Sequence, residues 1–300
     1  MRYLVIRTEN LGKEYRRQPA LSNLTIEVEP GEVYGVLGPQ GSGKSTLAHI
    51  LMDLVRPTHG NALVMGLDCQ RQSMQVRRLV GYLPQRLSFP GRGNGIQWIS
   101  RVAAARGGLD WEQTHQLANR FGVDLYKSTH QMSPGEQRKL GIIQAVLHQP
   151  ELLILDEPFN GLDAKAQGEL YRLVSELRNE GRTVLIPSKS LNEMERICDR
   201  VAVLNRGQLV AVERGVQLRG RAMRKIEMRF ATPVCADSFA GLSNLNNLVC
   251  DSNRLYCTVQ GDPDALIKAA AQYRILDFIS QQPSLEEVYQ TYYGIAAYAG

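Results

Sequence analysis

The stretch YGVLGPQGSGKSTL, from Tyr34 to Leu47, constrains the fold of this 300-residue chain more than any other. An apolar run leads directly into a glycine-rich loop and then into a helix, which predicts a strand–loop–helix unit of an α/β fold. The glycines let the backbone curl so that successive N–H groups point at one anion, and the helix adds its positive N-terminal end. The sequence therefore predicts a phosphate-binding loop.

Four residues of this loop, Gly38, Gly43, Lys44 and Ser45, match the pattern G-x-x-x-x-G-K-[ST]. Lys44 is expected to reach the β- and γ-phosphates of a nucleotide, and Ser45 to ligate Mg²⁺. The alternative is a glycine-rich turn with an incidental lysine, which the strand-to-helix context disfavours. The residues expected to wrap the phosphates are Gly38, Pro39, Gln40, Gly41, Ser42, Gly43, Lys44, Ser45 and Thr46.

A second apolar strand is predicted from Leu152 to Leu155, and it ends in Asp156 and Glu157. Two carboxylates at the tip of an apolar strand are costly unless they meet a cation or polarise water. Beside a phosphate loop, Asp156 is expected to act as an Mg²⁺ ligand and Glu157 as the base for an attacking water. An acidic helix cap is the alternative.

Upstream of that strand, QMSPGEQRKLGIIQAVLHQPE predicts a helix that ends at Pro150. Ser133 and Glu136 satisfy a capping box, and Pro134 suits the first helical turn. Two interpretations stay open: a helix simply packed on the core, or one whose exposed N-terminus forms a second anion site.

Composition indicates an ordinary soluble globular chain, with 43% apolar and 22% charged residues. No apolar run approaches the ~20 residues that a membrane-spanning helix needs, and the N-terminus lacks a signal-peptide core. The five cysteines form no C-x-x-C pair, so neither a disulfide framework nor a zinc site is expected. The net charge of +5 is scattered along the sequence, and no nucleic-acid partner is expected.

These motifs, in this order and spacing, resemble the nucleotide-binding subunit of an ABC transporter over about residues 1–220. The resemblance implies a P-loop NTPase fold with a RecA-like core, an antiparallel β subdomain and a helical subdomain at about residues 86–150. It also implies ATP and Mg²⁺ as cofactors, and a second nucleotide-binding subunit. The phosphate loop of one subunit and the signature helix of the other would sandwich ATP, and closure would drive membrane subunits.

The resemblance assigns a role to individual residues of this sequence. It implies that Tyr15 stacks on adenine, and that Gln85 touches Mg²⁺ and senses the membrane partner. The other matches are Ser133 to Gln137 on the family signature, with Ser133 and Gly135 facing the partner's ATP, Asp156 and Glu157 as the Walker B aspartate and catalytic glutamate, and Asn160 to Asp163 as the loop that crosses the dimer interface. Taken alone, Tyr15 could be a surface residue and Gln85 an ordinary loop amide.

Two positions depart from the family pattern. In TVLIPSKSLNEM, a predicted strand and a predicted helix flank Lys189, where relatives usually carry a histidine that contacts the γ-phosphate. A lysine ammonium is attracted to phosphate but cannot accept a hydrogen bond. Lys189 is therefore expected to hold ATP, but to position water and the interface loop less well than a histidine would. The alternative is that it points to solvent. Pro134 replaces a signature glycine, which predicts a stiffer anion site. Slow turnover is the expectation.

A small α+β appendage is predicted at residues 221–300, beyond a basic connector RGRAMRK. IEMRF, LYCTV and RILDFI predict strands, and DALIKAAAQY and LEEVYQTYY predict helices. The ending PSLEEVYQTYYG is similar to the tail of ATPase subunits from drug, antibiotic and lipid exporters that have separate membrane subunits. A dimerisation role and a structurally neutral addition both stay open.

The leading hypothesis is an ATPase subunit on the cytoplasmic face of a membrane, held there by the membrane subunits of an exporter. The alternatives are an ATP-clamped regulatory module with little hydrolysis and a non-transport ABC ATPase. DNA-acting and translational types are disfavoured, because the sequence has neither a long coiled-coil insertion nor a second cassette. A small-molecule kinase would leave the signature without a role. Homodimer and heterodimer remain open.

Overall fold

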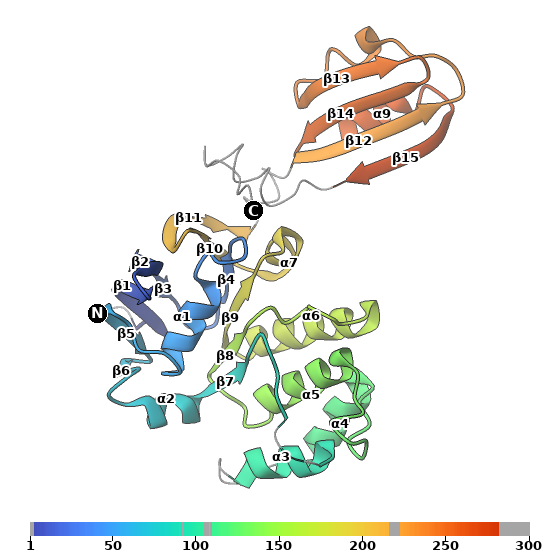
Figure 1. Ribbon diagram of the computed structural model, residues 1–300. Coiled ribbons are helices and arrows are strands. Elements are labelled where there is room, and N and C mark those ends of the chain that lie inside the picture. The colour runs from blue at the N-terminus through green and yellow to red at the C-terminus, as the bar shows by residue number, and fades with distance from the viewer. Residues whose placement is uncertain are drawn as a thin grey trace. The chain divides into compact units, whose positions relative to one another are not determined.

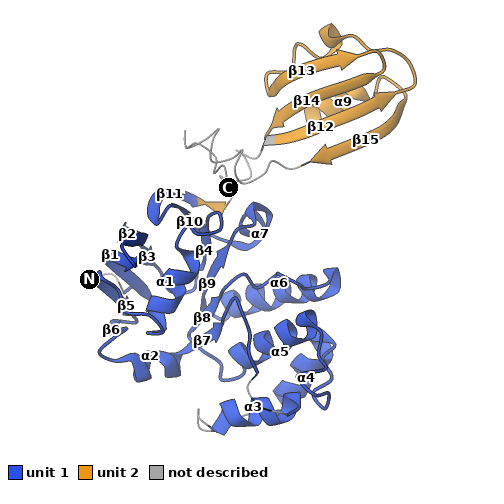
Figure 2. Cartoon of the chain, in the orientation of Figure 1, with its two compact units in different colours: residues 1–213 blue, residues 214–300 orange. Residues whose placement is uncertain are grey.

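The computed structural model describes residues 3–89, 91, 93–104, 108, 110–215 and 223–281. The chain divides into two compact units, residues 1–213 and 214–300, shown in blue and orange in Figure 2. Each unit has its own buried apolar core.

A six-stranded sheet forms the centre of the first unit (Figure 1). Every residue of β4 (Val33–Leu37), β8 (Leu152–Leu155) and β9 (Thr183–Ser188) is buried. Such near-continuous apolar strands are typical of a parallel sheet that helices cover on both faces. The neighbouring strands β10 and β4, β4 and β9, β9 and β8, and β8 and β7 all pair in parallel. In sheet order the strands are β11 (Gln208–Arg214), β10 (Arg200–Asn205), β4 (Val33–Leu37), β9 (Thr183–Ser188), β8 (Leu152–Leu155) and β7 (Val80–Leu83).

This strand order brings distant segments of the sequence together. β9 lies between β4, which leads into the phosphate loop, and β8, which ends at the two carboxylates. Ser188, the last residue of β9, is paired in register with Leu37, the last residue of β4. The carboxyl ends of all three strands therefore meet at one edge of the sheet, where ligands of open α/β sheets bind.

One helix follows each of the strands β4, β8 and β9, and each of these three helices contacts β9. They are α1 (Lys44–Leu51), α6 (Ala164–Asn179) and α7 (Leu191–Ile197). Side-chain caps begin two of them: Asp163 accepts from the N–H of Ala166 in α6, and Ser190 accepts from the N–H of Glu193 in α7. The predicted strand and helix that flank Lys189 are thus both present.

An antiparallel sheet lies beside α1 (Figure 1). Its apolar side chains join those of α1 in one core, which includes the fully buried Leu11, Leu24 and Leu47. The strands are β1 (Ile6–Tyr15), β2 (Gln18–Leu24), β3 (Glu27–Val28), β5 (His59–Val64) and β6 (Leu67–Asp68), and α2 (Ser73–Leu79) follows.

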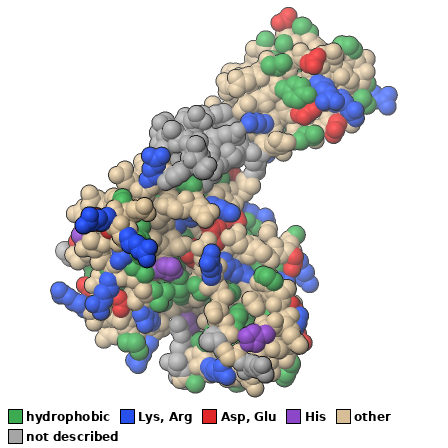
Figure 3. Space-filling model, in the orientation of Figure 1, with side chains coloured by type: hydrophobic (Ala, Val, Ile, Leu, Met, Phe, Trp, Pro, Cys, Tyr) green, Lys and Arg blue, Asp and Glu red, His purple; other side chains and the backbone are tan. Residues whose placement is uncertain are grey.

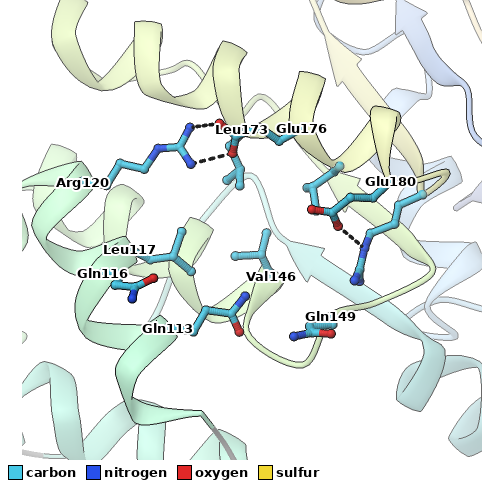
Figure 4. A pocket seen from close by; sticks show the side chains of 11 residues that line it. Gln113, Gln116, Leu117, Arg120, Val146, Gln149, Leu173, Glu176 and Glu180 are labelled. Atoms are coloured by element: carbon cyan, nitrogen blue, oxygen red, sulfur yellow. Dashed lines mark hydrogen bonds and ion pairs between the residues drawn. The ribbon is translucent and has the colours of Figure 1, made fainter.

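A helical segment lies between β7 and β8 and consists of α3 (Gly95–Ala104), α4 (Trp111–Phe121) and α5 (Pro134–Val146). Arg120 ties α4 to α6 of the core, because its guanidinium is 2.9 Å from Glu169 and 2.6 Å from Glu176. Figure 4 shows the Arg120–Glu176 ion pair beside a cleft of about 410 Å³ with Leu117, Val146 and Leu173 in its wall. No residue of the phosphate loop lines that cleft.

The C-terminal unit is a four-stranded antiparallel sheet in the order β13 (Leu245–Asp251), β14 (Arg254–Gln260), β12 (Met223–Phe230), β15 (Ile275–Gln281). Helix α9 (Asp264–Ala270) buries Leu266 and Ala270 in the core of this sheet. The three predicted strands and the first predicted helix are present. β13 was not predicted, a short 3₁₀ helix (Ala236–Ser238) precedes it, and the predicted helix LEEVYQTYY lies outside the described residues.

Within the described part of the chain, no helix has the length and apolarity that crossing a membrane requires. On the face seen in Figure 3, Lys and Arg side chains are spread among other residues and do not gather in a single basic patch.

We predict that Phe230→Ala lowers the free energy of unfolding of the C-terminal unit alone, by about 3–5 kcal/mol. Phe230 has no exposed surface, and its ring lies 5.8 Å from Tyr273 and 6.2 Å from Phe239. Both tryptophans, Trp98 and Trp111, lie in the first unit, so their fluorescence reports only that unit during denaturant titration.

Labelling of the buried thiol of Cys257, located by mass spectrometry, reports the C-terminal unit. The variant should label at lower denaturant concentration while the tryptophan midpoint stays fixed. A shift of both midpoints together would show that the two units unfold as one.

Candidate functional site

The phosphate loop, residues 38–43, connects β4 to α1, and the first residue of α1, Lys44, folds back onto it. The ammonium of Lys44 donates to the carbonyls of Gly38 at 2.6 Å and Pro39 at 2.9 Å. Gly43 has a φ of +101°, and a Cβ there would lie 2.5 Å from the carbonyl oxygen of Ala20. Only glycine fits both the left-handed backbone and the close approach, which explains this residue of the motif.

The Lys44 side chain is nearly buried, with 6% of the residue exposed. Burial lowers the pKa of Lys44, the nearby Glu157 and Asp156 carboxylates raise it, and the Lys189 charge lowers it. A buried ammonium needs anionic partners. The loop therefore favours an anionic ligand such as a phosphate group.

Asp156 is fully buried, and burial raises its pKa. Neither of its carboxylate oxygens meets hydrogen-bond criteria with a donor among the described residues, although the Ser45 hydroxyl lies close enough to oppose the pKa rise. The Ser45 hydroxyl also donates to Gln85 Oε1 at 3.5 Å. Three oxygen-bearing side chains thus converge, and their one hydrogen bond, from Ser45 to Gln85, leaves the Asp156 carboxylate without a donor that meets the criteria. Hard oxygen ligands around an unpaired buried carboxylate fit Mg²⁺.

Glu157 has a backbone φ of +49°, in the left-handed region that residues other than glycine rarely adopt. Its N–H donates to the carbonyl of Pro187 at 2.8 Å, which fixes this conformation against β9. Its Oε2 accepts from Asn160 Nδ2 and from the Ser188 hydroxyl, both at 3.4 Å. Burial raises the pKa of the carboxyl, while Lys44 lowers it. Strain of this kind concentrates at functional sites.

Lys44, Ser45, Gln85 and Glu157 line one cleft of about 440 Å³, whereas the predicted Gly38, Pro39 and Asp156 are not among its lining residues. Its lining includes the exposed Lys189, whose charge lowers the pKa of both Lys44 and Glu157. Of the residues predicted for the site, those that line the cleft are Tyr15, Gln40, Gly41, Ser42, Gly43, Lys44, Ser45, Thr46, Gln85, Glu157 and Lys189, and they are joined by Ala20, Arg86 and Asn160.

The N-terminus of α5 does not line this cleft. The Ser133 hydroxyl accepts from the N–H of Glu136 at 3.2 Å, and the Glu136 carboxylate accepts from the N–H of Ser133 at 2.7 Å, so the predicted capping box is present. The ion pair with Lys127 holds the pKa of Glu136 at about 2. A Cβ on Gly135 would lie 2.7 Å from the carbonyl oxygen of Gly161, so α5 and the NGLD loop touch.

Asp163 also lies outside the cleft. Besides capping α6, its carboxylate forms an ion pair with Lys139 of α5 at 2.7 Å, and this contact lowers its pKa. Ser133, Gly135 and Asp163 are therefore grouped together on α5 and the neighbouring loop. Their predicted contact with a nucleotide requires a second molecule.

Arg138 was not identified from the sequence. It is 5% exposed and donates to the carbonyls of Pro84 at 2.7 Å, Gln85 at 3.1 Å, Asp156 at 2.9 Å and Glu157. One side chain thereby connects the signature helix to both the glutamine loop and the carboxylate strand. One sequence feature could have identified it: Arg138 lies one helical turn before Ile142, so it is a charged residue on an otherwise apolar face of the predicted helix.

Comparison with known proteins agrees with this geometry. The sequence profile described as ABC transporter matches residues 21–160. The bacitracin transport ATP-binding protein BcrA of Enterococcus faecalis is 34% identical over 209 residues, which are 69% of this chain and 68% of BcrA. Escherichia coli YbhF, a probable multidrug ABC transporter ATP-binding protein, is 31% identical over 212 residues, which are 69% of this chain but 36% of YbhF.

A solved structure described as the ATP-binding subunit of an ABC transporter has the same fold. It superposes with a TM-score of 0.65 at 27% identity, over 70% of this chain and 90% of its own length.

We predict that Arg138→Lys weakens both the fold and nucleotide binding. An ammonium cannot span carbonyls on two segments, so at least one buried acceptor loses its donor, at a cost of about 1–3 kcal/mol in the free energy of unfolding. Denaturant titration and binding of a fluorescent ATP analogue would measure the two effects. Arg172→Lys on the exposed face of α6 is the matched control. Unchanged stability and affinity in the Arg138 variant would contradict the assigned role.

Proposed function

The chain belongs to the ABC transporter family, and we propose that it is the ATP-hydrolysing subunit that drives a separate membrane-embedded exporter. The observation that carries the proposal is the convergence of Lys44, Asp156 and Glu157 beside a glycine loop. The family members bind ATP with Mg²⁺. We place the ATP-binding domain at about residues 1–220 and the accessory domain after it.

In this proposal each residue at the cleft has one task. Lys44 holds the terminal phosphates, the loop N–H groups surround them, and Tyr15, which is 43% exposed at the rim, stacks on the adenine. Ser45, Gln85 and Asp156 hold Mg²⁺, which neutralises charge that develops on the phosphates. Glu157 accepts a proton from the attacking water.

A second subunit completes the site. Ser133 and Gly135 lie away from the chain's own cleft, so they serve the nucleotide of a partner. Closure of two subunits on ATP converts differential binding into motion, and the membrane subunits receive it beside Gln85 and the helical segment of residues 86–150. The chain is then held at the cytoplasmic face by its partners. Dimerisation aided by residues 221–300 is part of this proposal.

Export is favoured over other uses of ABC ATPases by the similarity to BcrA and YbhF, whose names describe bacitracin transport and multidrug transport. The ATP-clamped regulatory module is the competing function, because Lys189 and Pro134 depart from the family pattern. The strained, buried Glu157 favours hydrolysis.

Phosphate release separates the two functions. The wild-type chain, purified with any membrane subunits that accompany it, should release phosphate from ATP in many turnovers, and Glu157→Gln should reduce the rate by at least about 100-fold. Tight ATP retention with no release above that of Glu157→Gln would favour the regulatory module.

We predict that Lys189→His raises the steady-state ATPase rate by roughly tenfold or more, since an imidazole both donates and accepts a proton near the reacting groups. Lys189→Gln is the control, because it removes the charge without adding an acid–base group, and it should not accelerate turnover. An equal or lower rate for the histidine variant would contradict the assignment of Lys189 to the switch position.

A further inference from the structure

A buried serine hydroxyl lies between two carboxylates next to the ATP cleft. Ser188 ends β9 and has no exposed surface. Its Oγ is 2.6 Å from Glu193 Oε2 and 3.4 Å from Glu157 Oε2. Glu193 belongs to the first turn of α7 and does not line the cleft. The arrangement connects a residue away from the cleft to the carboxylate that faces the nucleotide.

The hydroxyl cannot serve both carboxylates at once. A serine hydroxyl has one proton and two lone pairs, and one lone pair of Ser188 already accepts from the N–H of Ser190 at 3.0 Å. When Glu193 is ionised, the short O–H···O⁻ contact takes the proton, because charge-assisted hydrogen bonds are the stronger ones. When Glu193 is protonated, it donates to the second lone pair, and the hydroxyl proton is then free to turn to Glu157.

Both states of Glu193 exist near neutral pH. Burial raises the pKa of Glu193 to about 7, the Glu157 carboxylate adds to the rise, and Ser188, Ser190 and the Lys189 charge oppose it.

The elements packed against α7 include α6, β4 and β9. Tyr171 faces Glu193 from α6, with the Arg196 guanidinium 4.0 Å from its ring centroid. Cys198 lies at the end of α7. Tyr34, the only titratable side chain of β4, packs in the core shared with α1, and β9 has no titratable side chain. Tyr171, Tyr34 and Cys198 all have raised pKa values and stay neutral at pH 7. Glu193 is therefore the group of this cluster that changes charge.

We propose that Glu193 is a positioning residue that acts on Glu157 through the hydroxyl of Ser188. Protonated Glu193 turns the hydroxyl toward Glu157, and a carboxylate that accepts an extra hydrogen bond is a weaker base. Ionised Glu193 withdraws that hydrogen bond and adds a like charge nearby, and both effects make Glu157 a stronger base. The proposal rests on the proposed role of Glu157 in hydrolysis.

Phosphate release at saturating MgATP, followed from pH 6.0 to 8.5 in the full chain, tests this relay. The wild-type rate should rise several-fold with a midpoint near pH 7. Glu193→Gln donates its amide N–H permanently to Ser188, so its rate should stay at the low wild-type level and lose the midpoint. Ser188→Ala should exceed the wild-type rate at pH 6. Glu195→Gln, the same change at another position of α7, should keep the wild-type profile.

A pH profile of Glu193→Gln that matches the wild type would overturn the proposal, provided that the variant binds ATP normally. A second measurement does not need turnover: the side-chain carboxyl ¹³C signal of Glu157 should shift with a midpoint near pH 7 in the wild type, and this step should vanish in Glu193→Gln. A Glu157 signal unaffected by the substitution would also overturn it. Absence of phosphate release at every pH, with the coupled signal present, would instead refute the proposed hydrolysis.

Discussion

The structure of the first unit depends on a buried cation beside two buried carboxylates. Lys44 begins α1 after β4, and Asp156 and Glu157 directly follow β8. They meet because β9 lies between β4 and β8 in one parallel sheet. Each of these charges would be costly alone. The two carboxylates raise the pKa of Lys44, Lys44 lowers the pKa of both carboxylates, and Asp156 raises that of Glu157. Among the described residues, no donor meets hydrogen-bond criteria with the Asp156 carboxylate. The Lys44 ammonium donates to a backbone carbonyl of the phosphate loop. A nucleotide with Mg²⁺ supplies both the missing anion and the missing cation.

Local signals in the sequence were sufficient for much of this fold. The β8 strand, the capping box at Ser133 and the helix start at Ser190 each depend on residues within a few positions, and the structure has all of them. Arg138 and the Ser188–Glu193 contact depend on segments that only tertiary structure brings together, so no local pattern revealed them. β13 was missed because LNNLVCD lacks the strict alternation of apolar and polar residues that predicts a strand.

One of the two departures from the family pattern, Lys189, lies at the end of a central strand. β9 ends between the phosphate loop and the carboxylates, and it is followed by Lys189, which lines the cleft. In the proposed account, the charge at this position binds phosphate but cannot accept a proton. The basicity of Glu157 then depends on its surroundings, namely Asn160, Ser188 and, through Ser188, Glu193. On this proposal, the subunit hydrolyses ATP slowly, and its rate depends on the protonation of Glu193.

The central claim is that two such subunits must close on the nucleotide, since Ser133 and Gly135 lie away from the cleft that holds Lys44. Light scattering of Glu157→Gln during size exclusion, with and without MgATP, tests this claim most directly. Blocked hydrolysis should hold the closed state, so the account predicts one chain without nucleotide and a pair of nucleotide-binding subunits with two bound ATP molecules in its presence. A single subunit that binds ATP at saturation and never pairs, either with its own copy or with a copurified partner, would contradict it.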